Sequence, residues 1–400
     1  MLGTNKIMAT SYRVSSPRWK RETERPGRGP GSRVLSGREL PVDKFMLAIV
    51  LGLTLFGAVM VYSASAILAD KNFGNQFYFL ARQARWGFVG LIAMAIAMRV
   101  DYRHYKRPFV VAGMLVGTLT LLIAVLFFPE INGTHRWITY GGLLSIQPSE
   151  ISKLALIAFL GFFLENRLSE IESYKRAFMP AAGVAGAVIG LVALEPDLGT
   201  ALTLSLVFLV MTFHSGMRMR HLATLAIPAV PALAYMLLFV PWRLQRLLDF
   251  LDPWKNQTTS SFQVVQSMIA IGSGGSSGVG FAQSKQKLFY LPAPHTDFIF
   301  AVIGEELGLI GAVTLVMLFA LLAWRGFKTA RSAPDMFGQL IAMGLTVMIT
   351  AQALFNVSVT LSLVPTKGIT LPFISYGGSS LAISLFAAGV LLNVSKHGKG

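Results

Sequence analysis

The sequence predicts an all-α polytopic membrane protein with ten transmembrane helices. Of its 400 residues, 54% are hydrophobic and only 14% are charged, and the mean hydropathy is +0.59. Apolar stretches long enough to cross a hydrocarbon core of about 30 Å recur from Phe45 to Val394. This composition excludes an ordinary soluble globular fold.

Ten helical spans follow one another along the chain. They cover residues 45–68, 86–100, 108–128, 149–164, 178–194, 199–213, 221–241, 298–324, 336–360 and 371–394. Residues 1–44 contain ten Lys and Arg and no apolar run, which indicates a disordered basic cytoplasmic arm. No signal-peptide cleavage pattern follows it, so we expect the first span to be retained. Residues 45–395 form the transmembrane domain, and residues 396–400 are a short tail.

The distribution of charge predicts that both termini are cytoplasmic. The net charge is +16, and this orientation places 24 Lys and Arg on the cytoplasmic side against ten outside, with Lys153 within a span. The large loop 242–296, between the seventh and eighth helices, then lies outside. Because the basic residues lie between apolar spans, we expect no nucleic acid partner. The chain has no Cys, which excludes disulfides and cysteine chemistry.

The large outer loop begins with an amphipathic segment, Trp242–Asp252. Its leucines share one face, with Arg243 and Arg246 near the other, which favours a helix in the membrane interface. Two arginines one turn apart could clamp a diphosphate, or the helix could only anchor on lipid headgroups. Gln263 and Gln266, also one turn apart, are candidates for substrate contact.

A glycine-rich stretch, residues 272–280, follows in the same loop. It fits neither GxxxxGK[ST] nor GxGxxG, so the sequence offers no nucleotide-binding motif here. The stretch could allow a close backbone approach to a ligand, with Lys285 and Lys287 adding positive charge. A flexible linker is the alternative.

Asp297 is the most informative residue of the outer loop. It stands between a proline-rich segment and the apolar helix that begins at Phe298, so we expect its carboxylate at the outer membrane–water boundary, near His295. The alternative is that Asp297 only caps this helix. Burial would raise its pKa and nearby cations would lower it, and the sequence leaves this balance open.

Four charged residues fall within the predicted spans. Glu305 and Glu306 lie in the eighth span, where a charge facing lipid costs about 2.5–3.5 kcal/mol, so they must face the bundle, a cavity or a partner. Glu150 and Lys153, one turn apart, are expected to pair with each other or with one of those glutamates. A structural ion pair and a ligand site are both open interpretations.

Three further segments complete the outer side. They are Asn132–Trp137 (NGTHRW), Glu195–Thr200 (EPDLGT) and Pro365–Ser380 (PTKGITLPFISYGGSS). Lys367 is the only cation of the last segment, whose small residues allow a helix or a ligand to approach closely. The sequence has no HExxH and no GxSxG motif, so zinc hydrolysis and serine acyl transfer have no support.

The chain resembles the SEDS family (shape, elongation, division and sporulation) over about residues 45–395. The motifs that carry the resemblance are, in order, NGTHRW, QPSEISK, EPDLGT, SKQKLFYLPAPHTDFIFAVIGEELG and PTKGITLPFISYGGSS. Within the family the chain is most similar to the cell-division branch, in its long basic arm above all. The elongation branch is the alternative.

The resemblance implies a peptidoglycan glycosyltransferase that polymerises lipid II, the undecaprenyl-diphosphate-linked precursor, at the outer face of the bacterial cytoplasmic membrane. The essential aspartate of the family falls on Asp297, which we interpret as general base in an inverting transfer. The cations available to the departing diphosphate are Arg243, Arg246, Lys285, Lys287 and Lys367. The sequence identifies no cofactor, although a divalent cation, Mg²⁺ or Mn²⁺, could assist.

The resemblance also implies partners. They are a class B penicillin-binding transpeptidase, FtsI-like in division, and other division proteins at the septum. A lipid II flippase and a scaffold that activates a partner are the alternative functions. An enzyme requires Asp297 and the outer loop, whereas a transporter requires charges on both sides of a pathway.

Overall fold

The structure is a computed structural model that describes residues 41–130, 134–140, 144–239, 241–259, 261–288 and 290–398. Residues 1–40, most of the predicted basic arm, lie outside the described residues. The chain contacts separate Met1–Arg38 from the unit Glu39–Gly400, and the description below concerns this second unit.

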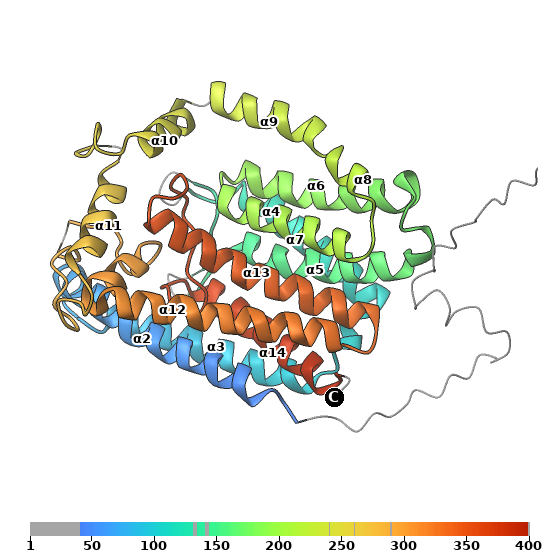
Figure 1. The fold of residues 1–400 in the computed structure, drawn as a ribbon, viewed down its shortest axis with the longest axis horizontal. Coiled ribbons are helices and arrows are strands. Elements are labelled where there is room, and N and C mark those ends of the chain that lie inside the picture. Colours follow the sequence, from blue (N-terminus) through green and yellow to red (C-terminus); the bar gives the residue numbers. More distant parts are fainter. Residues whose placement is uncertain are drawn as a thin grey trace, which may run out of the picture. The chain divides into compact units, whose positions relative to one another are not determined.

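The second unit is built almost entirely from helices (Figure 1). The longer helices are α2 (Lys44–Phe73), α3 (Tyr78–Arg99), α4 (Pro108–Val125), α5 (Pro148–Asn166), α6 (Met179–Leu194), α7 (Leu198–His214), α12 (Ile299–Ser332), α13 (Met336–Thr360) and α14 (Gly378–Lys396). The shorter helices are η1 (Tyr102–Lys106), η2 (Leu168–Glu170), η3 (Tyr174–Phe178), α8 (Met219–Ala223), α9 (Ala226–Leu238), α10 (Pro241–Leu251) and α11 (Phe262–Ser273). One antiparallel strand pair, β1 (Ile138–Tyr140) and β2 (Leu144–Ile146), precedes α5.

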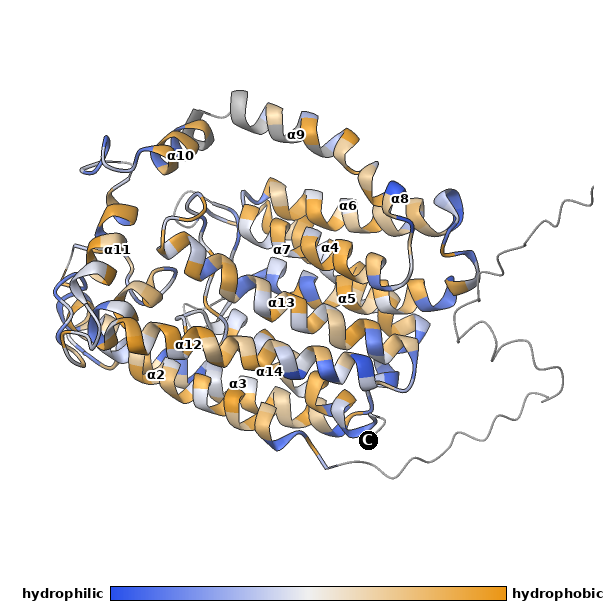
Figure 2. Ribbon diagram, in the orientation of Figure 1, coloured by the Kyte–Doolittle hydropathy of each residue, from blue (hydrophilic) through white to orange (hydrophobic). Residues whose placement is uncertain are grey.

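The helices confirm a helical membrane protein. Within the described residues, six helical segments are long and apolar enough to cross a membrane, namely α2, α4, α6 together with η3, α12, α13 and α14. Apolar residues dominate these helices in Figure 2. A helix occurs at each of the ten predicted spans. That all ten cross the membrane, with both termini cytoplasmic, stays a prediction.

Three predicted spans differ from the helices by seven or eight residues at one end, and one of them is the eighth, predicted to end at residue 324, whereas α12 continues to Ser332. The second span was placed at 86–100, but α3 already begins at Tyr78, because Arg82 and Arg85 lower the hydropathy of its first turns without breaking the helix. The Arg82 guanidinium lies over the Tyr78 ring, 4.9 Å from its centroid. The last span was placed at 371–394, but α14 begins only at Gly378, and residues 371–377 form a mostly buried loop before it.

Helices α13 and α14 form the centre of the bundle. In an apolar stretch of 18 residues, 78% of the residues of α13 and 72% of those of α14 are buried. The same measure for the peripheral helix α4 is 22%. Small residues allow α3 and α14 to pack closely. A Cβ added at Gly389 would lie 2.6 Å from the Met94 carbonyl oxygen, and one at Gly90 would lie 2.6 Å from Leu385 Cδ1.

Helix α12 is broken near its outer end at Gly308 (φ 66°, ψ −166°). The break removes the helical hydrogen bonds from residues 309–310 to residues 305–306, and the glycine-rich stretch replaces them. Residues 279–280 donate to the carbonyls of residues 305–306 at 3.0 and 3.1 Å, and residues 309–310 donate to the carbonyls of residues 275–276 at 2.9 and 3.1 Å. The broken helix therefore has its backbone satisfied without lipid or water.

The glycine-rich stretch approaches α12 itself. A Cβ added at Gly278 would lie 2.1 Å from the Glu306 carbonyl oxygen, so only glycine fits at this position. The prediction of a flexible linker is wrong, because the stretch is bonded to α12 at both ends. The close backbone approach that its glycines allow is made to a protein helix.

Helices α9 and α10 lead from the bundle into the outer loop. Figure 1 shows α9 standing apart from α6 and α13, with α10 beside its end. The predicted amphipathic helix at Trp242–Asp252 is confirmed as α10, and Leu248 and Leu251 on its apolar face are 50% and 70% exposed. An exposed apolar face suits a helix in contact with lipid.

Candidate active site

Asp297 lies at the start of α12 without capping it. The N-cap position of α12 belongs to Phe298 and has no side-chain hydrogen bond. The half-buried Asp297 carboxylate accepts no hydrogen bond from any residue that the structure describes. Its Oδ2 lies against the backbone of Gly368, where an added Cβ would be only 2.9 Å away. The capping interpretation is therefore wrong, and the carboxylate is left open for other chemistry.

Helix α13 and the loop that follows it hold the backbone around Asp297. Asn356 of α13 donates from Nδ2 to the carbonyls of Asp297 and Ile369, each at 2.7 Å. The Ser375 hydroxyl donates to the Thr296 carbonyl at 2.7 Å. These bonds fix the segment before α12 against the loop that contains Gly368 and Lys367, so the carboxylate is positioned by three separate parts of the chain.

His295 belongs to an aromatic cluster beside this segment. Its ring lies 4.3 Å from the Phe79 ring and 5.4 Å from the Tyr376 ring, between centroids, and its carbonyl accepts the Tyr376 N–H at 2.8 Å. Burial lowers the pKa of His295 to about 4, so the imidazole is neutral at neutral pH. We interpret His295 as a support for the loop.

The charges nearest to Asp297 come from the two other outer segments. Burial raises the pKa of Asp297 to about 6, while Arg136 acts to lower it and Asp197 to raise it further. Arg136 is held by the loop between α6 and α7, because its Nε donates to the Glu195 carbonyl at 3.0 Å and its Nη2 donates to the Pro196 carbonyl. Asp297 is thus a carboxylate at neutral pH that keeps a pKa close to the working range of a base.

Asp197 and Glu195 differ in their environment although they are two residues apart. Asp197 caps α7 by accepting the Thr200 N–H at 3.2 Å, and it also accepts hydrogen bonds from Ser149 and Gln147, each at 3.0 Å. Glu195 is fully buried, and neither carboxyl oxygen has a hydrogen-bond partner among the described residues. Burial, together with Asp197, raises the pKa of Glu195 to about 8 against the opposing effect of Arg136, so Glu195 is mostly protonated at neutral pH.

Two of the predicted diphosphate ligands reach the same region. Arg246 Nη1 donates to the Thr366 carbonyl at 3.5 Å, next to Lys367. Desolvation and the nearby Arg136 lower the pKa of Arg246, and burial lowers the pKa of Lys367. Arg136 therefore acts on both the Asp297 carboxylate and Arg246, and Arg246 reaches the loop that contains Lys367. The Arg243 side chain lies outside the described part of the structure.

Lys285 and Lys287 are placed differently from each other. Lys287 is buried, and its Nζ lies 2.7 Å from Glu306 Oε1 and 3.1 Å from the Ser63 hydroxyl. The Lys285 side chain is exposed, while its backbone N–H donates to Glu305 at 2.9 Å. Glu305 also accepts a hydrogen bond from the Ser284 hydroxyl. Both glutamates thus face the protein, as predicted, and they hold the end of the outer loop.

The remaining predicted residues lie elsewhere in the bundle. Glu150 and Lys153 are both buried and pair with each other at 2.8 Å, which confirms one of the two expected pairings. Gln263 is exposed and Gln266 half-buried on α11, which packs on α12. Among the described residues, no three or more His, Cys, Asp or Glu side chains come together as a metal site would require.

The sequence had singled out Asp297 and Lys367 but gave no role to Arg136, Glu195 or Asp197. These three residues lie in NGTHRW and EPDLGT, which indicated the outer side and the family resemblance but not a role for their charged residues. The available signal was the occurrence of charged residues at the ends of apolar spans on the same predicted side. Which of these charges meet Asp297 depends on the packing of helices far apart in the chain.

The fold and the site define a class of protein, a helical membrane protein with a half-buried carboxylate, Asp297, under the influence of Arg136 where its loops meet. A family model that covers FtsW, RodA and SpoVE, described as a cell cycle protein, matches residues 43–400. The chain belongs to this family, which is the SEDS family that its motifs resemble.

Curated relatives match almost the whole chain. A "probable peptidoglycan glycosyltransferase FtsW" from Geobacter sp. (strain M18) is 42% identical over 362 residues, which are 90% of this chain and 98% of the relative. The "Stage V sporulation protein E" of Bacillus subtilis (strain 168) is 42% identical over 361 residues, 89% of this chain and 98% of the relative.

Solved structures share the fold. One chain from a study on "structural coordination of polymerization and crosslinking by a peptidoglycan synthase complex" has a TM-score of 0.73 and 30% identity, covering 89% of this chain and 98% of its own. The rod shape determining protein RodA of Thermus thermophilus has a TM-score of 0.64 and 28% identity, with 90% and 99% covered.

Proposed function

We propose that this protein is a peptidoglycan glycosyltransferase that polymerises lipid II into glycan strands at the outer face of the cytoplasmic membrane during cell division. The names of its FtsW relatives support the activity. The observation that carries the proposal is the Asp297 carboxylate, which is half-buried, does not cap α12 and has a pKa raised by burial to about 6.

In the proposed reaction, Asp297 is the general base. It takes the proton from the 4-hydroxyl of the acceptor sugar as that oxygen attacks the anomeric carbon of the donor, with inversion. The bond from the anomeric carbon to the diphosphate oxygen breaks, and the lipid-linked diphosphate leaves as an anion. A base with a pKa near 6 is ionised at neutral pH and still accepts a proton readily.

The negative charge that develops on the leaving diphosphate needs cations. Arg246 and Lys367 lie in one region with Arg136, and we assign the stabilising role to these three side chains. Of the five cations predicted from the sequence, Lys287 has the least support as a diphosphate ligand, because contact with the diphosphate would require breaking its buried pair with Glu306. Arg243 and Lys285 remain candidates from the sequence.

Lipid II polymerisation by purified protein tests the general base. Asp297→Asn should reduce the polymerisation rate by about 10²–10⁴-fold while lipid II binding persists, since the amide cannot take a proton. Asp252→Asn is the matched control, because Asp252 is an exposed acid of the same loop. Normal polymer from a folded Asp297→Asn protein would exclude the role.

The remaining parts of the proposal concern placement and partners. We infer ten crossings with both termini cytoplasmic, a location at the division septum, and a complex with a class B penicillin-binding transpeptidase. The structural relative from a peptidoglycan synthase complex supports the partner. The flippase alternative has less support, because Glu150, Lys153 and Glu306 each have a partner within the protein.

A further inference from the structure

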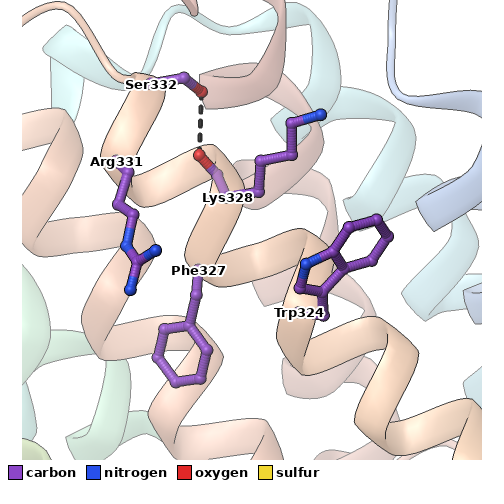
Figure 3. A pocket seen from close by; sticks show the side chains of 5 residues that line it. All are labelled: Trp324, Phe327, Lys328, Arg331 and Ser332. Carbon is purple, nitrogen blue, oxygen red and sulfur yellow. Dashed lines mark hydrogen bonds between the residues drawn. The ribbon is translucent and has the colours of Figure 1, made fainter.

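The inner end of α12 carries a hollow that the proposed reaction does not use. It has a volume of about 390 Å³ and is lined by Trp324, Phe327, Lys328, Arg331 and Ser332 (Figure 3). Between the break at Gly308 and Lys328, α12 is a continuous helix that rises about 1.5 Å per residue, so the hollow lies on the order of 30 Å from the break beside the candidate active site. It is therefore a separate feature.

The lining residues form one stripe on the helix. Trp324, Phe327, Lys328 and Arg331 follow the spacing i, i+3, i+4, i+7, which brings their side chains to one face. Figure 3 shows Trp324 and Lys328 on one flank of this face and Phe327 and Arg331 on the other. Along the helix, the two aromatic rings come first and the two cations follow toward the membrane surface.

This order matches the order of groups in a phospholipid. Acyl chains and glycerol lie deeper in a membrane, where aromatic side chains are favoured, and the phosphate lies above them, where Lys and Arg are favoured. The stripe also has no acid of its own, and neither Lys328 nor Arg331 has an ion pair within the described residues. Its two positive charges are thus available to an anion.

Neighbouring charges have partners and do not compete. Arg325 pairs with Asp43 at 2.6 Å. Asp335, the next acid along the chain, caps α13 at Gly338 and accepts a hydrogen bond from the Tyr102 hydroxyl. Arg325 and Asp335 therefore have their own partners, and neither is paired with Lys328 or Arg331.

We propose that this hollow binds the headgroup of an anionic phospholipid, with the phosphate between Lys328 and Arg331 and the upper acyl chain beside Trp324 and Phe327. With the orientation proposed above, the lipid belongs to the inner leaflet. Net charge decides the choice of lipid. A zwitterionic headgroup brings its own cation close to the two side chains, whereas phosphatidylglycerol does not.

Native mass spectrometry of the full chain, with phosphatidylglycerol and phosphatidylcholine in competition, tests the proposal. Each cation near a membrane surface is worth about a five-fold change in binding, so two predict roughly a 30-fold preference for phosphatidylglycerol. Lys328→Gln/Arg331→Gln should reduce this preference to near parity. Lys175→Gln/Arg220→Gln removes the same charge from exposed positions away from the hollow, and the preference should persist.

Three results would overturn the proposal. One is an unchanged preference in Lys328→Gln/Arg331→Gln, and another is an equal loss in the control variant, which would indicate general attraction to a basic surface. The third is displacement of the lipid by inorganic phosphate alone, which would indicate a site for a soluble anion. Quenching of Trp324 by phosphatidylglycerol with brominated chains, absent in Trp324→Phe, would locate the bound lipid at the hollow.

Discussion

Replacing Lys287 by Met should destabilise the protein by about 3–5 kcal/mol, because it leaves the Glu306 charge buried without a cation. The side chains of Lys287 and Glu306 are 4% and 0% exposed, and their charged atoms are 2.7 Å apart. Glu306 would keep the Ser63 hydroxyl at 2.7 Å and the Ala282 N–H at 3.1 Å. Two neutral donors satisfy its oxygens but do not neutralise its charge.

A double-mutant cycle isolates the pair. Glu306→Gln removes the charge and keeps the shape, so Lys287→Met/Glu306→Gln should recover about 2–3 kcal/mol relative to the sum of the single changes. Unfolding by SDS in mixed micelles, followed by tryptophan fluorescence, measures the free energy. Lys285→Met is the matched control, and because the Lys285 side chain is exposed, it should change stability by no more than about 0.5 kcal/mol.

The result also decides between two roles for Lys287. A Lys287→Met protein of normal stability that binds lipid II weakly would refute the structural pair and restore Lys287 as a diphosphate ligand. Loss of stability with normal lipid II affinity in the folded fraction would support the pair. The two outcomes are separable because stability and affinity are measured independently.

Four further predictions follow from the site and its surroundings. Polymerisation should decline as the pH falls through about 6, where Asp297 becomes protonated, and Arg136→Gln should move that midpoint upward, measured from initial rates. Arg246→Ala should slow turnover more than Arg246→Lys, whereas equal rates would leave only an anchoring role. A single Cys introduced at Ser276 should react with an impermeant reagent from outside in intact cells, and labelling only after the inner face is opened would reverse the topology. The purified chain should polymerise lipid II faster with its cognate transpeptidase than alone, and equal rates in a demonstrated complex would limit the partner to recruitment.

The positions of the helices could be predicted because the bilayer imposes a length and an apolar composition on each span. The break in α12 could not. Gly308 lies within an apolar run and breaks the helix only because residues 275–280, about thirty positions earlier, supply the replacement backbone bonds. The sequence of α12 alone looks the same whether the helix is broken or continuous. The break can be predicted only when the segment that bonds to it is known.

In the candidate site, too, some properties follow from neighbouring residues in the sequence and others from segments far away in the chain. Asp297 could be found from its place between a loop and an apolar helix, which is a local property. Asp297 does not cap α12 because the helix begins one residue later than a cap at Asp297 would require, and Phe298 takes the N-cap position. Its pKa depends on burial and on two opposing charges from distant segments, Arg136, which lowers it, and Asp197, which raises it. Local sequence therefore identifies the proposed general base, and the packing of distant loops decides its ionisation.

Four carboxyls of the bundle show how their surroundings decide whether a carboxyl is ionised. Glu306 has a cation at 2.7 Å and Asp197 has three hydrogen-bond donors, so their charges are stabilised in place. Glu195 has no partner among the described residues and keeps its proton at neutral pH. Asp297 lies between these cases, since it is ionised at neutral pH but receives no hydrogen bond from a described residue. Among these four carboxyls, it is the one that is ionised and receives no hydrogen bond from a described residue, which is what the proposed role of general base requires.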